Sequence, residues 1–140
     1  MTAAGPSPGE RFTLELPPDP AYVSAARLFA TTIAVQVGVE EESLDDLKVA
    51  IGEACARALA TAEGQPLSVK AERADGRLAF EVAQGATPPG TAGDLTSTPT
   101  PQELAVGLNL ELITALFDDA DVVDTAQGTP AVRFSVKAGA

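Results

Sequence analysis

The sequence predicts a two-layer α/β (α+β) sandwich, in which helices cover one face of a mixed, mostly antiparallel β-sheet. Two observations support this fold class. Segments of alternating apolar and polar residues occur in pairs joined by turn residues, as in β-hairpins. Segments with apolar residues at helical spacing separate these pairs. Hairpins interrupted by helices are typical of a largely antiparallel sheet that is covered on one side.

The first expected elements follow a flexible segment at residues 1–9, which is rich in Gly, Pro and Ser. A single domain is expected over residues 10–138. It begins with a half-buried strand at residues 11–16, where apolar and polar side chains alternate. Asp19 and Pro20 then supply a capping carboxylate and a proline at the first helical position, so a helix is expected to begin there.

The remaining elements are marked by turn and cap residues. Gly38 closes the first helix, and Ser43 is expected to begin a second one. Asp75 and Gly76 form a strong hairpin turn between two alternating segments. The later elements are a lid-like loop, a helix and a final pair of strands, expected at residues 84–101, 102–117, 120–124 and 131–137.

Composition excludes several function classes. The chain has 140 residues, a net charge of −11 and no histidine, so clustered cations for nucleic-acid binding are not expected. A single cysteine without histidine supports neither an internal disulfide nor a Cys/His metal site. Neither a secretory signal nor a membrane-spanning stretch is recognised, so a cytoplasmic location is expected.

Four segments together resemble a known family. Residues 44–59, LDDLKVAIGEACARAL, resemble the N-box helix of the bacterial anti-sigma-factor serine kinases, the RsbW-type branch of the histidine-kinase-like (GHKL) ATPases. Residues 14–34 resemble the family's first strand and helix. Residues 107–123 and 128–136 resemble its second glycine box and its closing strand. The resemblance covers nearly the whole chain and implies the family's Bergerat-type ATPase fold.

Two residues of the N-box helix carry the chemistry that the resemblance implies. Glu53 stands where the family has a glutamate thought to act as general base on a partner serine. The alternative is an ordinary ion pair between Glu53 and Arg57, one turn later. Arg57 replaces the family's Mg²⁺-binding asparagine, and a guanidinium has no acceptor atom for a metal. Arg57 could instead contact phosphate or neutralise Glu53.

The nucleotide-binding boxes are altered as well. Two alignments with the Asp-x-Gly of the first glycine box are open: Gln84 and Ala86 replace its Asp and Gly, or Gly85 is its glycine and Ala83 takes the place of the aspartate. Gln84 could pair with an adenine edge, or be an ordinary polar residue that opens a loop. Gly107 is kept in the second box, whereas Asn109 replaces its second glycine. Thr129 matches the threonine before the closing strand. ATP is therefore expected as a weak ligand and Mg²⁺ as a doubtful one.

The resemblance implies an anti-sigma-factor-like regulator of transcription that binds a sigma factor, an anti-anti-sigma (STAS-domain) protein, or both. A homodimer is also possible under this resemblance. The alternative is an active ATP-dependent kinase that phosphorylates the anti-anti-sigma protein, which Glu53 favours and Arg57 opposes. A third interpretation is an unrelated binding role, since a fold does not fix a function. The expectation is a weak or inactive kinase that works by binding proteins.

Overall fold

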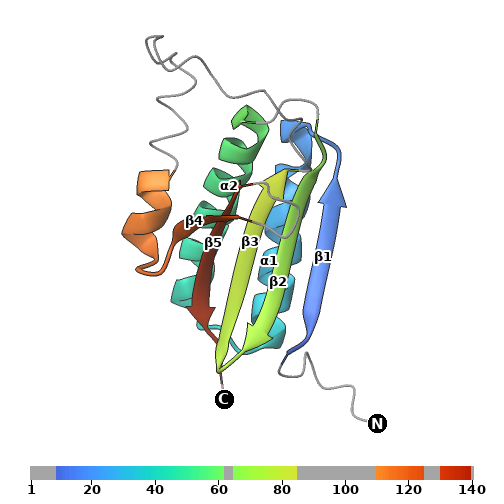
Figure 1. The fold of residues 1–140 in the computed structure, drawn as a ribbon. Helices are drawn as coiled ribbons and strands as arrows, with labels where there is room; N and C mark the ends of the chain where they lie inside the picture. Colours follow the sequence, from blue (N-terminus) through green and yellow to red (C-terminus); the bar gives the residue numbers. More distant parts are fainter. Residues whose placement is uncertain (1–8, 62–64, 85–109, 125–129, 140) are drawn as a thin grey trace.

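The computed structural model describes residues 9–61, 65–84, 110–124 and 130–139. Helices and strands form two layers, with the helices behind the sheet and no described helix on its front face (Figure 1). The elements are β1 (Arg11–Leu16), the 3₁₀ helix η1 (Pro20–Tyr22), α1 (Val23–Gln36), α2 (Glu41–Thr61), β2 (Leu67–Ala74), β3 (Arg77–Gln84), a helix at residues 110–116, β4 (Asp121–Asp124) and β5 (Pro130–Lys137). The predicted two-layer sandwich is confirmed.

The sheet has the strand order β1-β2-β3-β5-β4, and each neighbouring pair is antiparallel. The prediction of a mostly antiparallel sheet is therefore confirmed, and the five described strands contain no parallel pair. Asp75 and Gly76 join β2 to β3 with φ angles of 53° and 73°. Two positive φ angles in succession are the geometry of a two-residue hairpin turn, which Asp-Gly adopts readily.

The start and end of the first helical segment follow the predicted signals. The side chain of Asp19 accepts a hydrogen bond from the backbone N–H of Ala21 at 2.9 Å, as expected for a cap. Pro20 begins a 3₁₀ turn, and α1 continues from Val23. Gly38 follows α1 with a φ of 79°, a left-handed conformation that costs glycine little.

The start of α2 differs from the prediction. α2 begins at Glu41, so the expected start at Ser43 is wrong by two residues. Glu41 and Glu42 occupy the first turn, where the helix dipole favours carboxylates. The backbone N–H of Leu44 already donates to the carbonyl of Glu40 at 3.1 Å, so Ser43 lies inside the first turn.

The core fills the space between the helices and the sheet. Phe134 on β5 stacks against Phe80 on β3 and against Phe117, with ring centroids 5.7 and 4.9 Å apart. Leu47 and Ile51 of α2 are fully buried above the sheet. This packing holds one face of α2 against the sheet and leaves its two flanks for other contacts.

The length of α2, 21 residues, is close to that of a bilayer span, but its sequence is charged. In the part of the chain that the structure describes, no helix is both long and apolar enough to cross a membrane.

The topology brings several chain ends to one end of the molecule (Figure 1). α2 and β3 finish there, and β5 begins there because it runs antiparallel to β3. The described helix at residues 110–116 also begins near this end. The segments in which the sequence places the nucleotide boxes therefore join the described elements at the same end.

Three predicted features lie outside the described residues and stay predictions. They are the flexible segment at residues 1–9 apart from Gly9, the lid-like loop of residues 84–101 beyond Gln84, and the first half of the helix expected at residues 102–117.

Candidate functional site

Glu53 and Arg57 lie on the flank of α2 that faces away from α1. They are one turn apart, and both side chains are half-buried. Gly52 marks the other flank, because a Cβ added there would lie 2.5 Å from Nη2 of Arg27 on α1. Arg57 is about 140° around the helix from Gly52. Asp46, on the flank of Arg57, lines a pocket together with the end of the helix that precedes β4.

The guanidinium of Arg57 contains a donor without an acceptor. Its Nε–H is buried and has no hydrogen-bond partner within the described structure. The predicted alternative, an ion pair with Glu53, therefore does not use this donor. Burial also lowers the pKa of Arg57, because a less polar environment disfavours the charged form. Unsatisfied buried donors are rare and cost about 1–3 kcal/mol each, so this one needs an explanation.

The structure places the other predicted site residues only in part. Gln84 is the last residue of β3 and pairs with Leu67 of β2. The end of β3 lies at the same end of the molecule as the end of α2 (Figure 1). The remaining predicted site residues lie outside the described part of the chain, and their roles stay predictions: Gly85, Gly107, Asn109 and Thr129.

The chemistry of Arg57 fits a phosphate group better than Mg²⁺. Magnesium demands several oxygen ligands in near-octahedral arrangement, and Arg57 offers only N–H donors and a positive charge. Guanidinium groups bind phosphate oxygens well through their N–H donors. Among the residues that the structure describes, no cluster of three or more His, Cys, Asp or Glu side chains could hold a metal ion.

Cys55, on the apolar face of α2, is a core residue. It is fully buried, as its helical position predicts. Burial raises the pKa of its thiol to about 12, although the charge of Arg27 opposes this. The thiolate is therefore scarce at neutral pH, and Cys55 is no nucleophile.

Residues 16–135 match a family described as the histidine kinase-like ATPase domain. The chain belongs to this family. Membership implies an ATP site as the common feature of the histidine kinase-like ATPase domains. The end of the molecule where α2 and β3 finish carries Arg57 and Gln84, two of the residues that the sequence assigns to that site.

Several relatives in the histidine kinase-like family are serine-protein kinases named RsbW. The one from Listeria innocua is 31% identical, and the match covers 79% of this chain and 77% of the relative. The one from Listeria monocytogenes serotype 4a is 44% identical over 45 residues, which are 32% of this chain and 29% of that relative. The resemblance to RsbW-type proteins predicted from the sequence is confirmed.

A solved structure shows the same fold. The crystal structure of the RsbU and RsbW domains of Rv1364c from Mycobacterium tuberculosis superposes with a TM-score of 0.66 at 16% identity. The match covers 95% of this chain and 32% of that longer one. At this identity the likeness supports the histidine kinase-like fold and nothing finer.

The outer surface of α1 has an apolar stripe that the sequence analysis missed. Leu28 and Val35 are seven residues apart, and they are 67% and 59% exposed. Val35 also lines a groove of about 390 Å³ between α1 and α2, together with Leu44 and Lys48. The signal was present in the sequence, because Leu28 and Val35 fall off the buried helical stripe while keeping helical spacing with each other.

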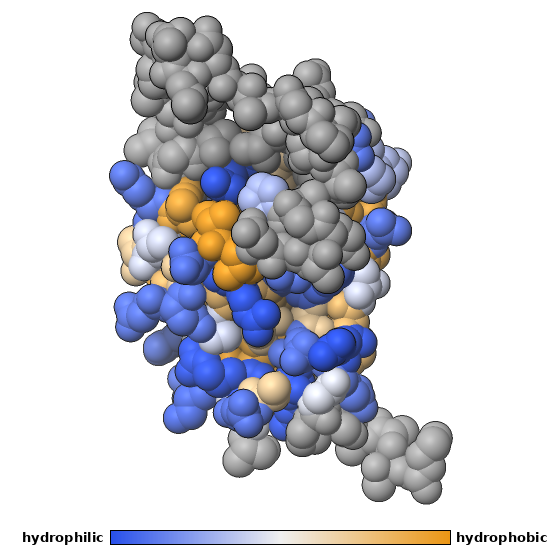
Figure 2. Space-filling view, viewed as in Figure 1, coloured by the Kyte–Doolittle hydropathy of each residue, from blue (hydrophilic) through white to orange (hydrophobic). Residues whose placement is uncertain are grey.

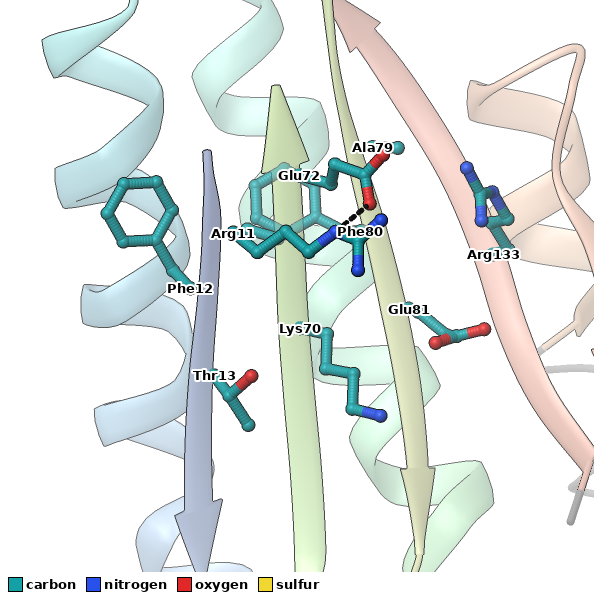
Figure 3. Close-up of a pocket in the computed structure, with 10 residues that line it drawn as sticks. Arg11, Phe12, Thr13, Lys70, Glu72, Ala79, Phe80, Glu81 and Arg133 are labelled. Carbon is teal, nitrogen blue, oxygen red and sulfur yellow. Dashed lines mark ion pairs between the residues drawn. The ribbon is translucent and has the colours of Figure 1, made fainter. Parts of the chain in front are cut away.

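The open face of the sheet carries side chains of opposite charge in register. Arg11 and Glu72 form an ion pair at 2.9 Å, and the register places Lys70 and Arg133 on either side of Glu81 (Figure 3). These side chains line a shallow hollow. Hydrophilic residues gather over the lower part of this face (Figure 2). Alternating signs leave the described face without the cation cluster that nucleic-acid binding needs.

A polar cluster lies at the opposite end of the sheet from Arg57. Ser135 is 8% exposed, and its hydroxyl accepts a hydrogen bond from Nε of Arg77 at 2.7 Å. Its backbone N–H donates to Asp119 at 3.1 Å, and its hydroxyl also donates to that carboxylate. Burial raises the pKa of Asp119, but the hydrogen bonds from Ser135 and the charge of Arg77 outweigh it and hold this pKa below its ordinary value. The cluster ties β5 to the turn before β4.

Proposed function

We propose that this chain is an anti-sigma-factor-like regulator of transcription with a degenerate nucleotide site. It binds a sigma factor, an anti-anti-sigma (STAS-domain) protein, or both in competition, and it acts in the cytoplasm. Two findings support the proposal: the similarity of most of the chain to RsbW serine-protein kinases, and an arginine with an unpartnered donor in its N-box helix.

The observation that carries partner binding is the exposed stripe of α1. Leu28 and Val35 expose apolar surface, and Val35 lines the groove between α1 and α2. Burying such side chains against a partner gains about 1.5–3 kcal/mol each. The stripe follows one helix face, so it suits a helix of the partner laid across α1 and α2. Nothing in the catalysis of phosphoryl transfer needs these side chains exposed.

Charge favours a basic partner at this surface. Acidic side chains crowd the turn into α2 and its first residues, beginning with Glu40, Glu41 and Glu42. The chain as a whole has a net charge of −11. Complementary charge speeds encounter and selects among partners, so a sigma-factor region rich in Lys and Arg is the expected occupant.

Nucleotide has little influence on this binding in our proposal. A ligand can bias the choice between partners only by its different affinity for the two bound states. The resemblance implies that the lid and the phosphate site differ between the two bound states in the intact family, and here Arg57 replaces the magnesium ligand of that site. ATP is therefore a weak ligand with no switching role, and regulation rests on competition between protein partners.

The test measures the affinity of purified sigma factors and STAS-domain proteins of the source organism for this chain, with and without ATP–Mg²⁺. We expect at least one sigma factor to bind, with less than about a tenfold change on adding ATP–Mg²⁺. Leu28→Asp should weaken binding by about tenfold or more, because a carboxylate would be buried in an apolar contact.

Leu112→Asp is the matched control. Leu112 is 50% exposed on the helix at residues 110–116, so the same substitution there should leave the partner affinity unchanged. Equal loss in both variants, or no binding of any sigma factor or STAS-domain protein, would refute the proposed function.

The alternative is an active serine kinase, and the place of Glu53 on the rigid helix α2 favours it. The same mixtures distinguish the two functions when phosphate transfer to the STAS-domain protein is followed. Transfer at roughly 1 per second or faster, as in working kinases, would support the kinase and overturn the degenerate site.

A further inference from the structure

We propose that two copies of this chain associate through the open face of the sheet, where no described helix lies. The two copies are related by a two-fold axis that runs along the strands, between β3 and β5. The inference goes beyond the proposed function, which places the other protein partners on the helix side of the molecule, at α1 and α2. It rests on the charges that the strand register brings together on the sheet.

The net charge of the open face differs from that of the chain as a whole. Directly paired residues, and residues two apart along a strand, project from the same face, so the register identifies its charged side chains. The cations are Arg11, Lys70, Arg77, Arg133 and Lys137, and the carboxylates are Glu15, Glu72, Glu81 and Asp121. The cations thus outnumber the carboxylates by one, whereas the whole chain has a net charge of −11. Two copies that approach through their acidic sides repel each other, and this face avoids that repulsion.

Four of these side chains form a row across the sheet. The register aligns Lys70 of β2, Glu81 of β3, Arg133 of β5 and Asp121 of β4, so the charges alternate from positive to negative along the row. The first three line the shallow hollow on this face (Figure 3). Within the described structure no ion pair joins members of this row to one another, in contrast to Arg11 and Glu72. The row is therefore available for charges of another molecule.

The order of the charges makes the row complementary to itself. A two-fold axis along the strands reverses the row in the second copy, so that every charge faces one of opposite sign. Glu81 then faces Arg133 of the second copy, Lys70 faces Asp121 of the second copy, and the symmetry produces each pair twice. Sheets packed face to face lie about 10 Å apart, a gap that long charged side chains from both copies can bridge.

The character of the contact predicts its strength. Ion pairs that remain accessible to water each contribute little and are screened by salt. Arg133 and Asp121 are exposed, and Lys70 and Glu81 are half-buried in the single chain. The dimer should therefore be reversible, and its affinity should fall as the salt concentration rises.

The experiment measures the mass of the full chain in solution by sedimentation equilibrium. We expect the wild type to dimerise at about 100 μM in low salt, and high salt to weaken the dimer by about tenfold or more. Glu81→Lys places a cation against Arg133 of the second copy, and Arg133→Glu places a carboxylate against Glu81 of the second copy. Each variant alone should dimerise about tenfold or more less tightly than the wild type.

Mixing the two variants tests whether the charges meet between copies. In an equimolar mixture of Glu81→Lys and Arg133→Glu, the introduced lysine of one chain faces the introduced glutamate of the other. The retained Arg133 likewise faces the retained Glu81, so the mixture should form a heterodimer at least as tightly as the wild type dimerises. A defect within the single chain could not be repaired by mixing, so recovery of the dimer identifies a contact between copies.

Lys48→Glu is the matched control, because Lys48 is exposed on α2, behind the sheet, and the substitution changes the net charge as Arg133→Glu does. The dimer affinity of Lys48→Glu should equal that of the wild type. Three results would each overturn the inference: a wild type that is monomeric at about 100 μM in low salt, single variants that dimerise as tightly as the wild type, or a mixture that stays monomeric.

The failure of this inference can be told apart from failure of the proposed function. The proposed function is tested by sigma-factor affinity and by Leu28→Asp, a substitution on α1 that should leave the dimer intact. A monomer that binds its sigma factor would refute this inference alone, and a dimer that binds neither a sigma factor nor a STAS-domain protein would refute the proposed function alone.

Discussion

Arg57 combines a permanent charge, a half-buried position and a donor without an acceptor among the described residues. Each of these lowers the stability of the folded state in the absence of a ligand. Helical propensity does not explain the choice, because leucine or methionine would serve α2 as well. Arg57 is therefore a residue that the stability of the fold alone does not require.

The first prediction follows at the same scale. Arg57→Met removes the unsatisfied donor and keeps the packing of the stem, so the free energy of unfolding should rise by about 1 kcal/mol. Urea denaturation of the ligand-free protein measures it. Arg133→Met on the exposed surface should change the free energy of unfolding little. A loss of stability in Arg57→Met would show that the donor has a partner.

At the scale of elements, two glycines perform different tasks in the helix pair. Gly52 lets the guanidinium of Arg27 lie across α2, since a Cβ there would meet the end of that side chain. Gly38 ends α1 in a left-handed conformation and lies against the backbone of Gly139, 3.1 Å from the position of an added Cβ. A flexible side chain can move aside, whereas backbone cannot.

These contacts predict opposite signs for the same substitution. Gly52→Ala should raise the free energy of unfolding by up to about 1 kcal/mol, because alanine favours the helix and the exposed Arg27 can shift. Gly38→Ala should lower it by about 1–2 kcal/mol, the cost of a left-handed alanine. Thermal or urea unfolding of both variants measures these changes. A lower free energy of unfolding in both variants would mean that the side chain of Arg27 cannot move away from position 52.

At the scale of the whole molecule, the cluster of Asp119, Ser135 and Arg77 joins parts of the chain that lie far apart. Arg77 begins β3, and its partner Ser135 lies 58 positions later on β5. Asp119 adds the turn before β4 to the same cluster. The cluster thus holds one corner of the sheet together, and the stability that it contributes depends on the charge of the Asp119 carboxylate.

The pH dependence of stability tests this fastening. The pKa of Asp119 in the folded protein lies below its ordinary value of 3.8. The carboxylate therefore contributes to the free energy of unfolding above pH 3.8, and this contribution is lost as the pH falls through the lower pKa of the folded state. Asp119→Asn should therefore lower the free energy of unfolding at pH 7, by less than about 1 kcal/mol because the carboxylate is largely exposed. The difference from wild type should fade below pH 3.8.

Asp118→Asn provides the control one position earlier on the exposed surface, and it should alter stability little at either pH. A constant difference between wild type and Asp119→Asn across the acid range would contradict the role of the charge.

Much of the fold could be predicted because its signals are local. Alternation, helical spacing, the Asp19 cap and the Asp75–Gly76 turn each act within a few residues, and all of them are found in the structure. The error at Ser43 has the same origin. Both Ser43 and the carboxylates of the preceding residues are favourable near a helix start. The hydrogen bond from the backbone N–H of Leu44 to the carbonyl of Glu40 shows that α2 begins at Glu41.

The candidate site was predictable in part. Glu53 and Arg57 could be placed one turn apart on a helix from their spacing alone, and the chemistry of a guanidinium excluded Arg57 as a magnesium ligand. The flank on which they lie could not be inferred, because it depends on where α1 and the other helix pack. The exposure of Leu28 and Val35 likewise follows from what covers α1 and what does not.

By itself, therefore, the sequence determined the types and order of the elements, the family, and the chemistry available at each position. Only the tertiary structure decided that β5 lies between β3 and β4, that Nε of Arg57 is buried without a partner, and that Arg77 meets Ser135. The physical reason is the distance along the chain over which each interaction acts. Propensities, caps and turns are set by neighbours along the chain, whereas burial and hydrogen-bond satisfaction are set by residues that meet only after the layers have packed.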